Sequence, residues 1–218
     1  MQWFVVLPLR CLITLMMPPE SLSWLERWCL ARLIRAIASA IGVAPQRWDY
    51  VGFIEITRQL QRGRSPAQQQ AIVATVFDRL IPPMMSTLIR KLFRPSRWVC
   101  EWNAWFATRL TGWLVGASDR YWVEVIPPNQ LPQWQHSGVR IQKCRYLAES
   151  QCMALCMNLC KKPTEQFFRQ RLGIPLTMTP NFKDYSCEMV FGTPAQPIPQ
   201  PPLLPCWQDP SQTPCPYV

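Results

Sequence analysis

Residues 143–164 read KCRYLAESQCMALCMNLCKKPT and place four cysteines within seventeen positions. Cys152, Cys156 and Cys160 are spaced four residues apart. A step of four residues on an α-helix advances about 6 Å and turns about 40° past a full circle. The spacing therefore predicts a ridge of three thiols on one side of a helix. We expect Cys144, just upstream, to lie at a strand end from which it can fold back onto this ridge.

Three chemical interpretations of the ridge remain open. The thiols can be small apolar side chains in a core, because free cysteine behaves as a small hydrophobe. They can form a structural zinc site, although zinc prefers Cys-x-x-Cys knuckles and the sequence has none. They can also hold an iron–sulfur cluster, which takes four cysteines and tolerates varied spacings. Disulfides between helical neighbours four residues apart are geometrically poor.

We favour iron, bound as an iron–sulfur cluster, as the cofactor. The spacing does not identify which four cysteines bind it, so every cysteine from residue 144 onward is a candidate ligand. These candidates are Cys144, Cys152, Cys156, Cys160, Cys187, Cys206 and Cys215.

The positive charge of the chain is concentrated in its N-terminal part. The 218 residues carry a formal net charge of +10, and 17 basic against 8 acidic residues precede Cys144. A basic surface favours nucleic acid or an anionic membrane as partner. No nucleic-acid-binding motif is present, and eleven tryptophans favour a membrane interface. The expected partners are thus a membrane surface, bound peripherally, and no nucleic acid.

Residues 1–20 are expected to form a short apolar extension. Pro8 and Arg10 interrupt it, and it is shorter than the ~18 apolar residues that a spanning helix needs. It also lacks the basic start and the small-residue cleavage site of a secretory signal. Without a signal or transit peptide, we expect the protein in the cytoplasm, on a photosynthetic membrane. Ten cysteines in that compartment favour metal binding over structural disulfides.

Residues 21–126 are expected to form a basic, Trp-rich helical domain. Helical periodicity with caps and breakers predicts helices over 21–42, 48–63, 65–83, 84–93 and 96–116. The first is either an amphipathic helix packed on the domain or a helix lying in a membrane surface. The last carries Trp98, Trp102, Trp105 and Trp113 near one face. This stripe is either core or a slot for a long, flat apolar ligand.

A Pro- and Gln-containing loop over 127–138 is the expected linker to a cysteine-rich module, residues 139–218. Strands are predicted over 121–126 and 139–147, and a strand or turn over 186–192. A short helix is expected over 162–173, and the tail is too rich in proline for regular structure. The fold class is therefore mainly α, with a helical N-terminal platform and a small α+β C-terminal module.

Several enzyme classes are excluded by the sequence. It contains neither a Gly-rich phosphate loop nor a GxGxxG pattern. His136 is the single histidine, so a histidine-based triad would have to include it. No catalytic residue can be assigned. Glu188, beside Cys187, is a weak candidate that either tunes the site or serves as a structural hydrogen-bond acceptor.

Long stretches of the chain resemble a known family. KCRYLAESQCMALCMNLCKKPTEQFF, then GIPLTMTPNFKDYSCEMVFG and a late PCWQDPSQTPC, are similar to the β-carotene isomerase family that opens strigolactone biosynthesis in plants. The resemblance runs from about Ser21 to the C-terminus, and the chain lacks the plastid transit peptide of the plant members. It therefore resembles a homologue from a photosynthetic prokaryote.

The resemblance implies an iron-dependent enzyme. Its reaction would be the reversible interconversion of all-trans- and 9-cis-β-carotene, or of a related carotenoid taken from a membrane. An electron donor is a further partner that such an enzyme could use. The alternative is a non-enzymatic iron–sulfur electron carrier, or a membrane-docked interaction protein stapled by a metal.

Overall fold

The computed structural model describes residues 22–93, 96–126 and 131–194. The predicted N-terminal extension, Cys206 and Cys215 lie outside these residues. Six helices precede the sheet in the described part of the chain. They are α2 (Trp24–Ile41), α3 (Tyr50–Gln61), α4 (Pro66–Leu80), α5 (Pro83–Leu92), α6 (Arg97–Leu110) and α7 (Gly112–Val115).

The helices begin and end at residues with clear capping chemistry. Ser65 caps α4, since its hydroxyl accepts the backbone N–H of Gln68 while the Gln68 side chain accepts that of Ser65. The cap of α2 is Ser23, and Gly42 ends the helix in a left-handed conformation at φ 72°. Both helices fall within the predicted ranges 21–42 and 65–83, but α2 begins three residues later than predicted, because Ser23 and not Ser21 caps it.

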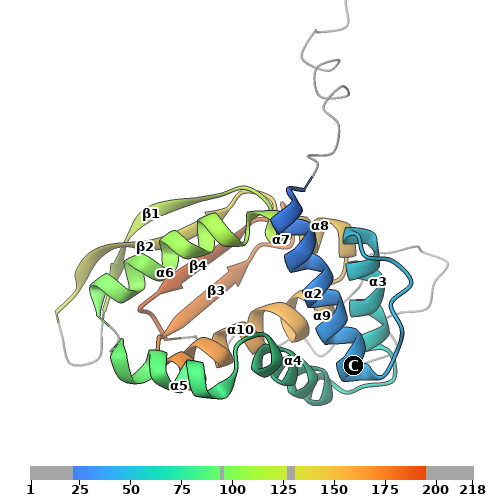
Figure 1. The fold of residues 1–218 in the computed structure, drawn as a ribbon. Helices are drawn as coiled ribbons and strands as arrows, with labels where there is room; N and C mark the ends of the chain where they lie inside the picture. The colour runs from blue at the N-terminus through green and yellow to red at the C-terminus, as the bar shows by residue number, and fades with distance from the viewer. Residues whose placement is uncertain (1–21, 94–95, 127–130, 195–218) are drawn as a thin grey trace, which may run out of the picture.

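Four strands form one antiparallel sheet of order β1-β2-β4-β3 (Figure 1). They are β1 (Ser118–Val125), β2 (Gln133–Ile141), β3 (Leu176–Pro180) and β4 (Cys187–Phe191). The loop predicted over 127–138 overlaps β2, whose inward side chains Gln135, Ser137 and Val139 are buried. Two of these three are polar, so the alternation typical of a strand was not visible in the hydrophobic pattern.

The segment between β2 and β3 is an irregular helical run. It contains α8 (Arg145–Ser150), α9 (Met153–Leu155), η1 (Cys156–Lys161), α10 (Lys162–Phe167) and η2 (Phe168–Leu172). η1 and η2 are π-helical, and Gly173 ends the run at φ 74°. Single π-helical turns within helices occur frequently at functional sites.

Helices and sheet share one hydrophobic core. Its buried members come from α2, α3 and α4 as well as from the strands and the irregular helical run. α6 lies across β2 and also contacts β1 and β4, while α2 packs against α3 and α4 (Figure 1). The predicted fold class, mainly α with a small α+β part, is confirmed.

No single described helix is long and apolar enough to cross a membrane. α4 and α5 have the length and apolar composition of a membrane-spanning segment only when they are taken together. The axes of these two helices are bent by 79° relative to each other.

Candidate functional site

Four free cysteines line a single cavity of about 120 Å³. Cys144 precedes α8, Cys156 and Cys160 lie on η1, and Cys187 begins β4. Cys160 is half-buried and the other three are buried. We call this space the thiol cavity. It joins residues that are up to 43 positions apart in the sequence.

A tight turn brings the first and last of these cysteines together. Asn181 Oδ1 accepts the backbone N–H of Lys183 at 3.0 Å, and Asp184 Oδ1 accepts that of Ser186 at 2.8 Å. The carbonyl of Tyr185 in this turn accepts the backbone N–H of Cys144 at 2.7 Å. Asn181 and Asp184 thus shape the turn by bonding to nearby backbone, as Asn and Asp side chains commonly do.

Gly116 lets the end of α7 approach the same region. It has φ +97°, and a Cβ atom there would lie 2.8 Å from the carbonyl oxygen of Lys143. An L side chain is disfavoured both by that conformation and by the close contact. The close packing next to Cys144 therefore depends on glycine.

The predicted ridge of three thiols is wrong at its first member. Cys152 is extended, with φ −141° and ψ 113°, and the helix begins only at Met153. Its sulfur is disulfide-bonded and accepts a long hydrogen bond of 3.9 Å from Gln61 Nε2. Cys152 is also absent from the lining of the thiol cavity. Only Cys156 and Cys160 of the predicted ridge face it.

Burial raises the pKa of all four cavity thiols. For Cys187 the pKa rises to about 12, first through burial and then through the neighbouring Cys144. The pKa values of Cys144, Cys156 and Cys160 are raised for the same leading reason. Lys161 opposes the increase at Cys156, Cys160 and Cys187 because a nearby cation favours the thiolate.

Lys161 is a buried cation at the wall of the cavity. Its side chain is 3% exposed and forms an ion pair with Glu165, one turn further along the helix. Glu165 Oε1 also accepts the backbone N–H of Met178 at 2.7 Å. Sequence reasoning missed this pair. The spacing of four residues was visible, but a lysine and a glutamate at that spacing usually form an exposed pair.

Among the described residues, the Tyr146 hydroxyl has no hydrogen-bond partner of good geometry. Burial raises its pKa, and the Thr57 side chain lies close enough to oppose that rise. The residue is buried, lines the thiol cavity, and its oxygen is unsatisfied within the described part of the chain. Such a group costs about 1–3 kcal/mol. Thr57, which also faces this region, donates its own hydroxyl hydrogen to the carbonyl of Ile54.

The donor set matches the demands of an iron–sulfur cluster in number and kind. Four thiols share one cavity, a buried cation lies beside them, and an unpaired hydroxyl is available to a sulfur acceptor. Within the described residues, no group of three His, Cys, Asp or Glu side chains is placed to hold a single metal ion. Iron binding therefore stays a prediction.

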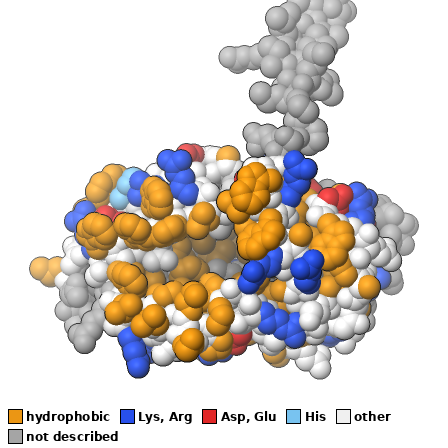
Figure 2. Space-filling model, viewed as in Figure 1, with side chains coloured by type: hydrophobic (Ala, Val, Ile, Leu, Met, Phe, Trp, Pro, Cys, Tyr) orange, Lys and Arg blue, Asp and Glu red, His pale blue; other side chains and the backbone are white. Residues whose placement is uncertain are grey.

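An open apolar groove of about 480 Å³ lies between α5 and α6 (Figure 2). The side chains of Trp98, Trp102 and Phe106 line it from α6, and Ile89 and Phe93 line it from the region of α5. Its volume falls in the usual range of small-molecule sites, about 300–1,000 Å³. Trp98 and Trp102 thus occupy the kind of slot that the sequence predicted.

The groove and the thiol cavity lie over the same face of the sheet. Ile174 lines the groove, Met178 lines the cavity, and residues 174, 176 and 178 are the buried alternate positions of one extended segment. Four extended residues span at most about 13 Å. Between the two sites lies Leu176, paired with Phe191.

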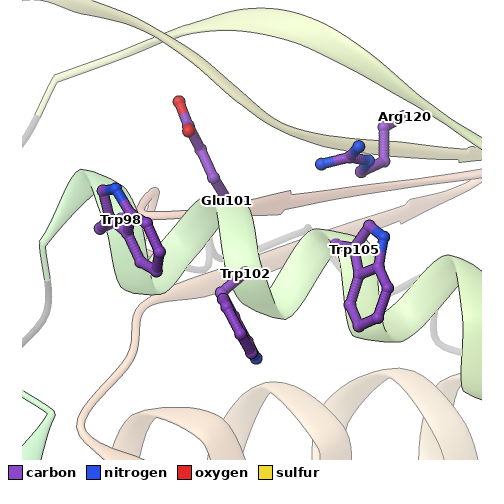
Figure 3. Close-up of a pocket in the computed structure, with 5 residues that line it drawn as sticks. All are labelled: Trp98, Glu101, Trp102, Trp105 and Arg120. Carbon is purple, nitrogen blue, oxygen red and sulfur yellow. The ribbon is translucent and has the colours of Figure 1, made fainter.

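The other two predicted slot tryptophans, Trp105 and Trp113, do not line the apolar groove. Trp105 borders a shallower hollow of about 290 Å³ on α6, which it shares with Trp98 and Trp102 of the predicted stripe and with Glu101 and Arg120 (Figure 3). In this view Trp102 points to the opposite side of the helix from Glu101. Trp113 is half-buried against the core and lines neither the groove nor the thiol cavity.

A second, inner apolar pocket adjoins the thiol cavity. It has a volume of about 130 Å³ and is lined by side chains of α2, α3 and α4. Five residues line both spaces, namely Leu114, Val115, Tyr146, Cys160 and Thr164. The thiols are therefore surrounded by apolar space on two sides.

Glu188 does not face the thiol cavity. Cys187 and Met189 line it, so the alternation of a strand directs Glu188 to the opposite face of the sheet. There its carboxylate accepts hydrogen bonds from Arg140 at 2.6 and 3.0 Å and from Tyr121 at 3.4 Å. These contacts agree with the alternative that Glu188 serves as a structural hydrogen-bond acceptor.

These features define a mixed α/β protein in which a buried group of four free thiols shares a sheet face with an open apolar groove. The family model "Beta-carotene isomerase D27-like, C-terminal" matches residues 113–200, which include all four cavity thiols. The chain belongs to the D27-like β-carotene isomerase family.

Two curated relatives carry the name "Beta-carotene isomerase D27, chloroplastic". The protein from Medicago truncatula is 32% identical over 170 residues, and that from Arabidopsis thaliana is 34% identical over 173 residues. Each alignment covers 78% of this chain but only 66% and 64% of the relatives' own lengths. No solved structure matches the chain.

Proposed function

We propose that this protein is an iron-dependent carotenoid cis/trans isomerase that reversibly interconverts all-trans- and 9-cis-β-carotene or a related carotenoid. The observation that carries the proposal is the placement of the thiol cavity and the apolar groove over one sheet face, where their lining residues Met178 and Ile174 are only four residues apart, at most about 13 Å along an extended chain. Family membership supports the same reaction class.

The groove would bind the polyene. Its aromatic walls, Trp98, Trp102 and Phe106, offer flat faces to a conjugated chain. A long hydrocarbon lying along β3 would extend from the groove toward the thiol cavity over Leu176. The buried rings there, including Phe191, would keep water away from the reacting bond.

The four cavity thiols, from Cys144, Cys156, Cys160 and Cys187, would hold the iron. Bound iron supplies either a reversible one-electron exchange or a Lewis acid, and both lower the order of a polyene double bond without net redox change. Lys161 would offset the negative charge of the thiolates, and the Tyr146 hydroxyl would donate a hydrogen bond to a sulfur.

The test is incubation of the anaerobically purified, iron-replete protein with all-trans-β-carotene, followed by chromatographic separation of the isomers. We expect formation of a cis isomer until a constant ratio is reached from either side. An unchanged ratio at full iron content would refute the isomerase. A reversible redox signal with unchanged carotene would identify an electron carrier instead.

A pair of cysteine variants tests the ligand assignment. We expect Cys156→Ser to lose bound iron together with its sulfur-to-iron absorption, while Cys152→Ser keeps both, because only Cys156 lines the thiol cavity. Both residues are buried, but Cys152 is disulfide-bonded, so Cys100→Ser, at a buried free cysteine outside the thiol cavity, is the better matched control and should also keep iron. Equal iron contents in the two variants would overturn the assignment.

A further inference from the structure

The outward surface of α5 is unusual for a helix of a globular protein. Of its ten residues, only Ser86 is buried. Met84 is 84% exposed, Leu88 55% and Leu92 66%. These three residues are four apart, so they form one stripe along the helix. A surface helix ordinarily turns such a stripe toward the core.

The contacts of α5 explain why this stripe faces outward. The helix rests on η2, and Arg90 Nη1 donates to the carbonyl of Gln170 at 2.9 Å. Ser86 is the position buried beneath it. Ile89 and Phe93 line the apolar groove, and the stripe of Met84, Leu88 and Leu92 is not part of that lining.

Apolar side chains of two other helices are exposed on the same face of the molecule. Figure 2 shows hydrophobic side chains on both sides of the hollow and over α2, with basic side chains among them. In α2 the exposed apolar residues are Trp24, Leu25 and Trp28, near its N-terminal end, whereas Leu30 and Ile34 are buried. In α6 they include Trp98 and Trp102.

The charge of these helices points to an anionic partner. Together α2, α5 and α6 carry seven Arg or Lys residues and only two carboxylates, Glu26 and Glu101. Glu101 is paired with Arg97 at 2.8 Å, and α5 has no acidic residue. Exposed Trp, Leu and Met interleaved with cations is the composition of a surface that lies in a membrane interface.

We propose that the outward stripe of α5, with the exposed N-terminal half of α2 and the tryptophans of α6, docks the protein on a bilayer that contains anionic lipids. We call this surface the docking face. It places the mouth of the apolar groove against the membrane. The proposal deepens the proposed function because it identifies the surface through which a water-insoluble substrate enters, but the docking itself requires no catalysis.

The test is co-sedimentation of the full chain with vesicles of phosphatidylcholine alone and with 30% phosphatidylglycerol. We expect binding to the anionic vesicles that weakens as salt is raised. The double substitution Leu88→Asp, Leu92→Asp is expected to lower the partition coefficient by at least about tenfold, since it removes two apolar side chains from the interface and places two negative charges against anionic lipid.

Trp134→Asp is the matched control, because Trp134 is 62% exposed and lies on β2, outside the docking face. It should bind vesicles as the unaltered protein does. Absence of vesicle binding by the unaltered protein, or equal binding by the double variant, would overturn the proposal. The proposal would also be overturned if the unaltered protein self-associates in sedimentation velocity but does not bind vesicles, and if the double variant abolishes that self-association.

An isomerase assay with carotene in detergent micelles separates this proposal from the proposed function. Leu88 and Leu92 line neither the groove nor the thiol cavity. The double variant should therefore isomerise micellar carotene normally but fail on carotene supplied in vesicles. Inactivity of every form in micelles would refute the isomerase and leave the vesicle-binding result intact.

Discussion

The ammonium group of Lys161 lies in a buried ion pair with the carboxylate of Glu165, and the same carboxylate oxygen accepts the backbone N–H of Met178 at 2.7 Å. The pair thereby ties η1, which carries Cys156 and Cys160, to β3 at the wall of the thiol cavity. A cation held in this way compensates negative charge that forms on the sulfurs.

Lys161→Met is expected to destabilise the protein by about 3–5 kcal/mol, because it leaves the Glu165 carboxylate buried and unpaired. Iron content should fall as well. Lys162→Met, at the half-buried neighbouring position, should change both quantities little. Chemical denaturation and iron determination measure the effects. The double substitution Lys161→Met, Glu165→Gln should regain part of the stability, and a failure to do so would contradict the charge argument.

The buried residues Tyr146 and Tyr50 are a matched pair that tests whether the Tyr146 hydroxyl is unsatisfied. In the metal-free protein, Tyr146→Phe should stabilise by about 1 kcal/mol, since it removes an unpaired polar group. Tyr50→Phe should destabilise by a similar amount, because the Tyr50 hydroxyl donates to the carbonyl of Leu114 at 2.6 Å. Urea denaturation decides the signs, and equal signs would show that the Tyr146 hydroxyl is already satisfied.

Gly116→Ala should cost at least about 2 kcal/mol, as it combines a positive φ with a contact to the carbonyl of Lys143. Gly112→Ala is the control. Gly112 begins α7, and a Cβ atom there meets nothing within 4 Å. The control should be neutral or stabilising by up to about 1 kcal/mol. The melting temperature of Gly116→Ala should therefore fall, while that of Gly112→Ala stays the same or rises.

The buried thiol of Cys100 should make the free energy of unfolding depend on pH in the alkaline range. Burial, followed by the charge of Glu101, raises the pKa of this thiol to about 11 from an ordinary value of 9.0. The Cys100 thiol loses its proton at a lower pH in the unfolded chain than in the folded protein. Its contribution to the free energy of unfolding is therefore complete below about pH 9 and is lost as the pH rises through about 11. The stability difference between the unaltered protein and Cys100→Ala should therefore shrink by about 2–3 kcal/mol over that range. A constant difference would contradict the raised pKa.

Glu188→Gln should change neither iron content nor isomerase activity. The carboxylate lies on the far face of the sheet in a partly exposed pair with Arg140, and such pairs contribute about 0–1 kcal/mol. Loss of iron from this variant would restore Glu188 as a residue of the site.

Much of the helical framework could be predicted from the sequence, because its signals are local. Ser65, Pro66 and Gly42 fix helix ends through contacts within a few residues. The residues at the thiol cavity were harder to predict. β3 was missed altogether, and Cys152 was grouped with Cys156 although the chain is extended at Cys152 and becomes helical only afterwards.

The sequence by itself determined the helix periods, the caps, the basic N-terminal part and the family, since each depends on residue identity and short spacing. Only the tertiary structure decided that Cys144 and Cys187 join Cys156 and Cys160, that Lys161 is buried, and that α5 turns its apolar stripe outward. The physical reason is that these outcomes depend on which segments pack together. Strand pairing and helix packing over long sequence separations set that packing, and no spacing along the chain encodes it.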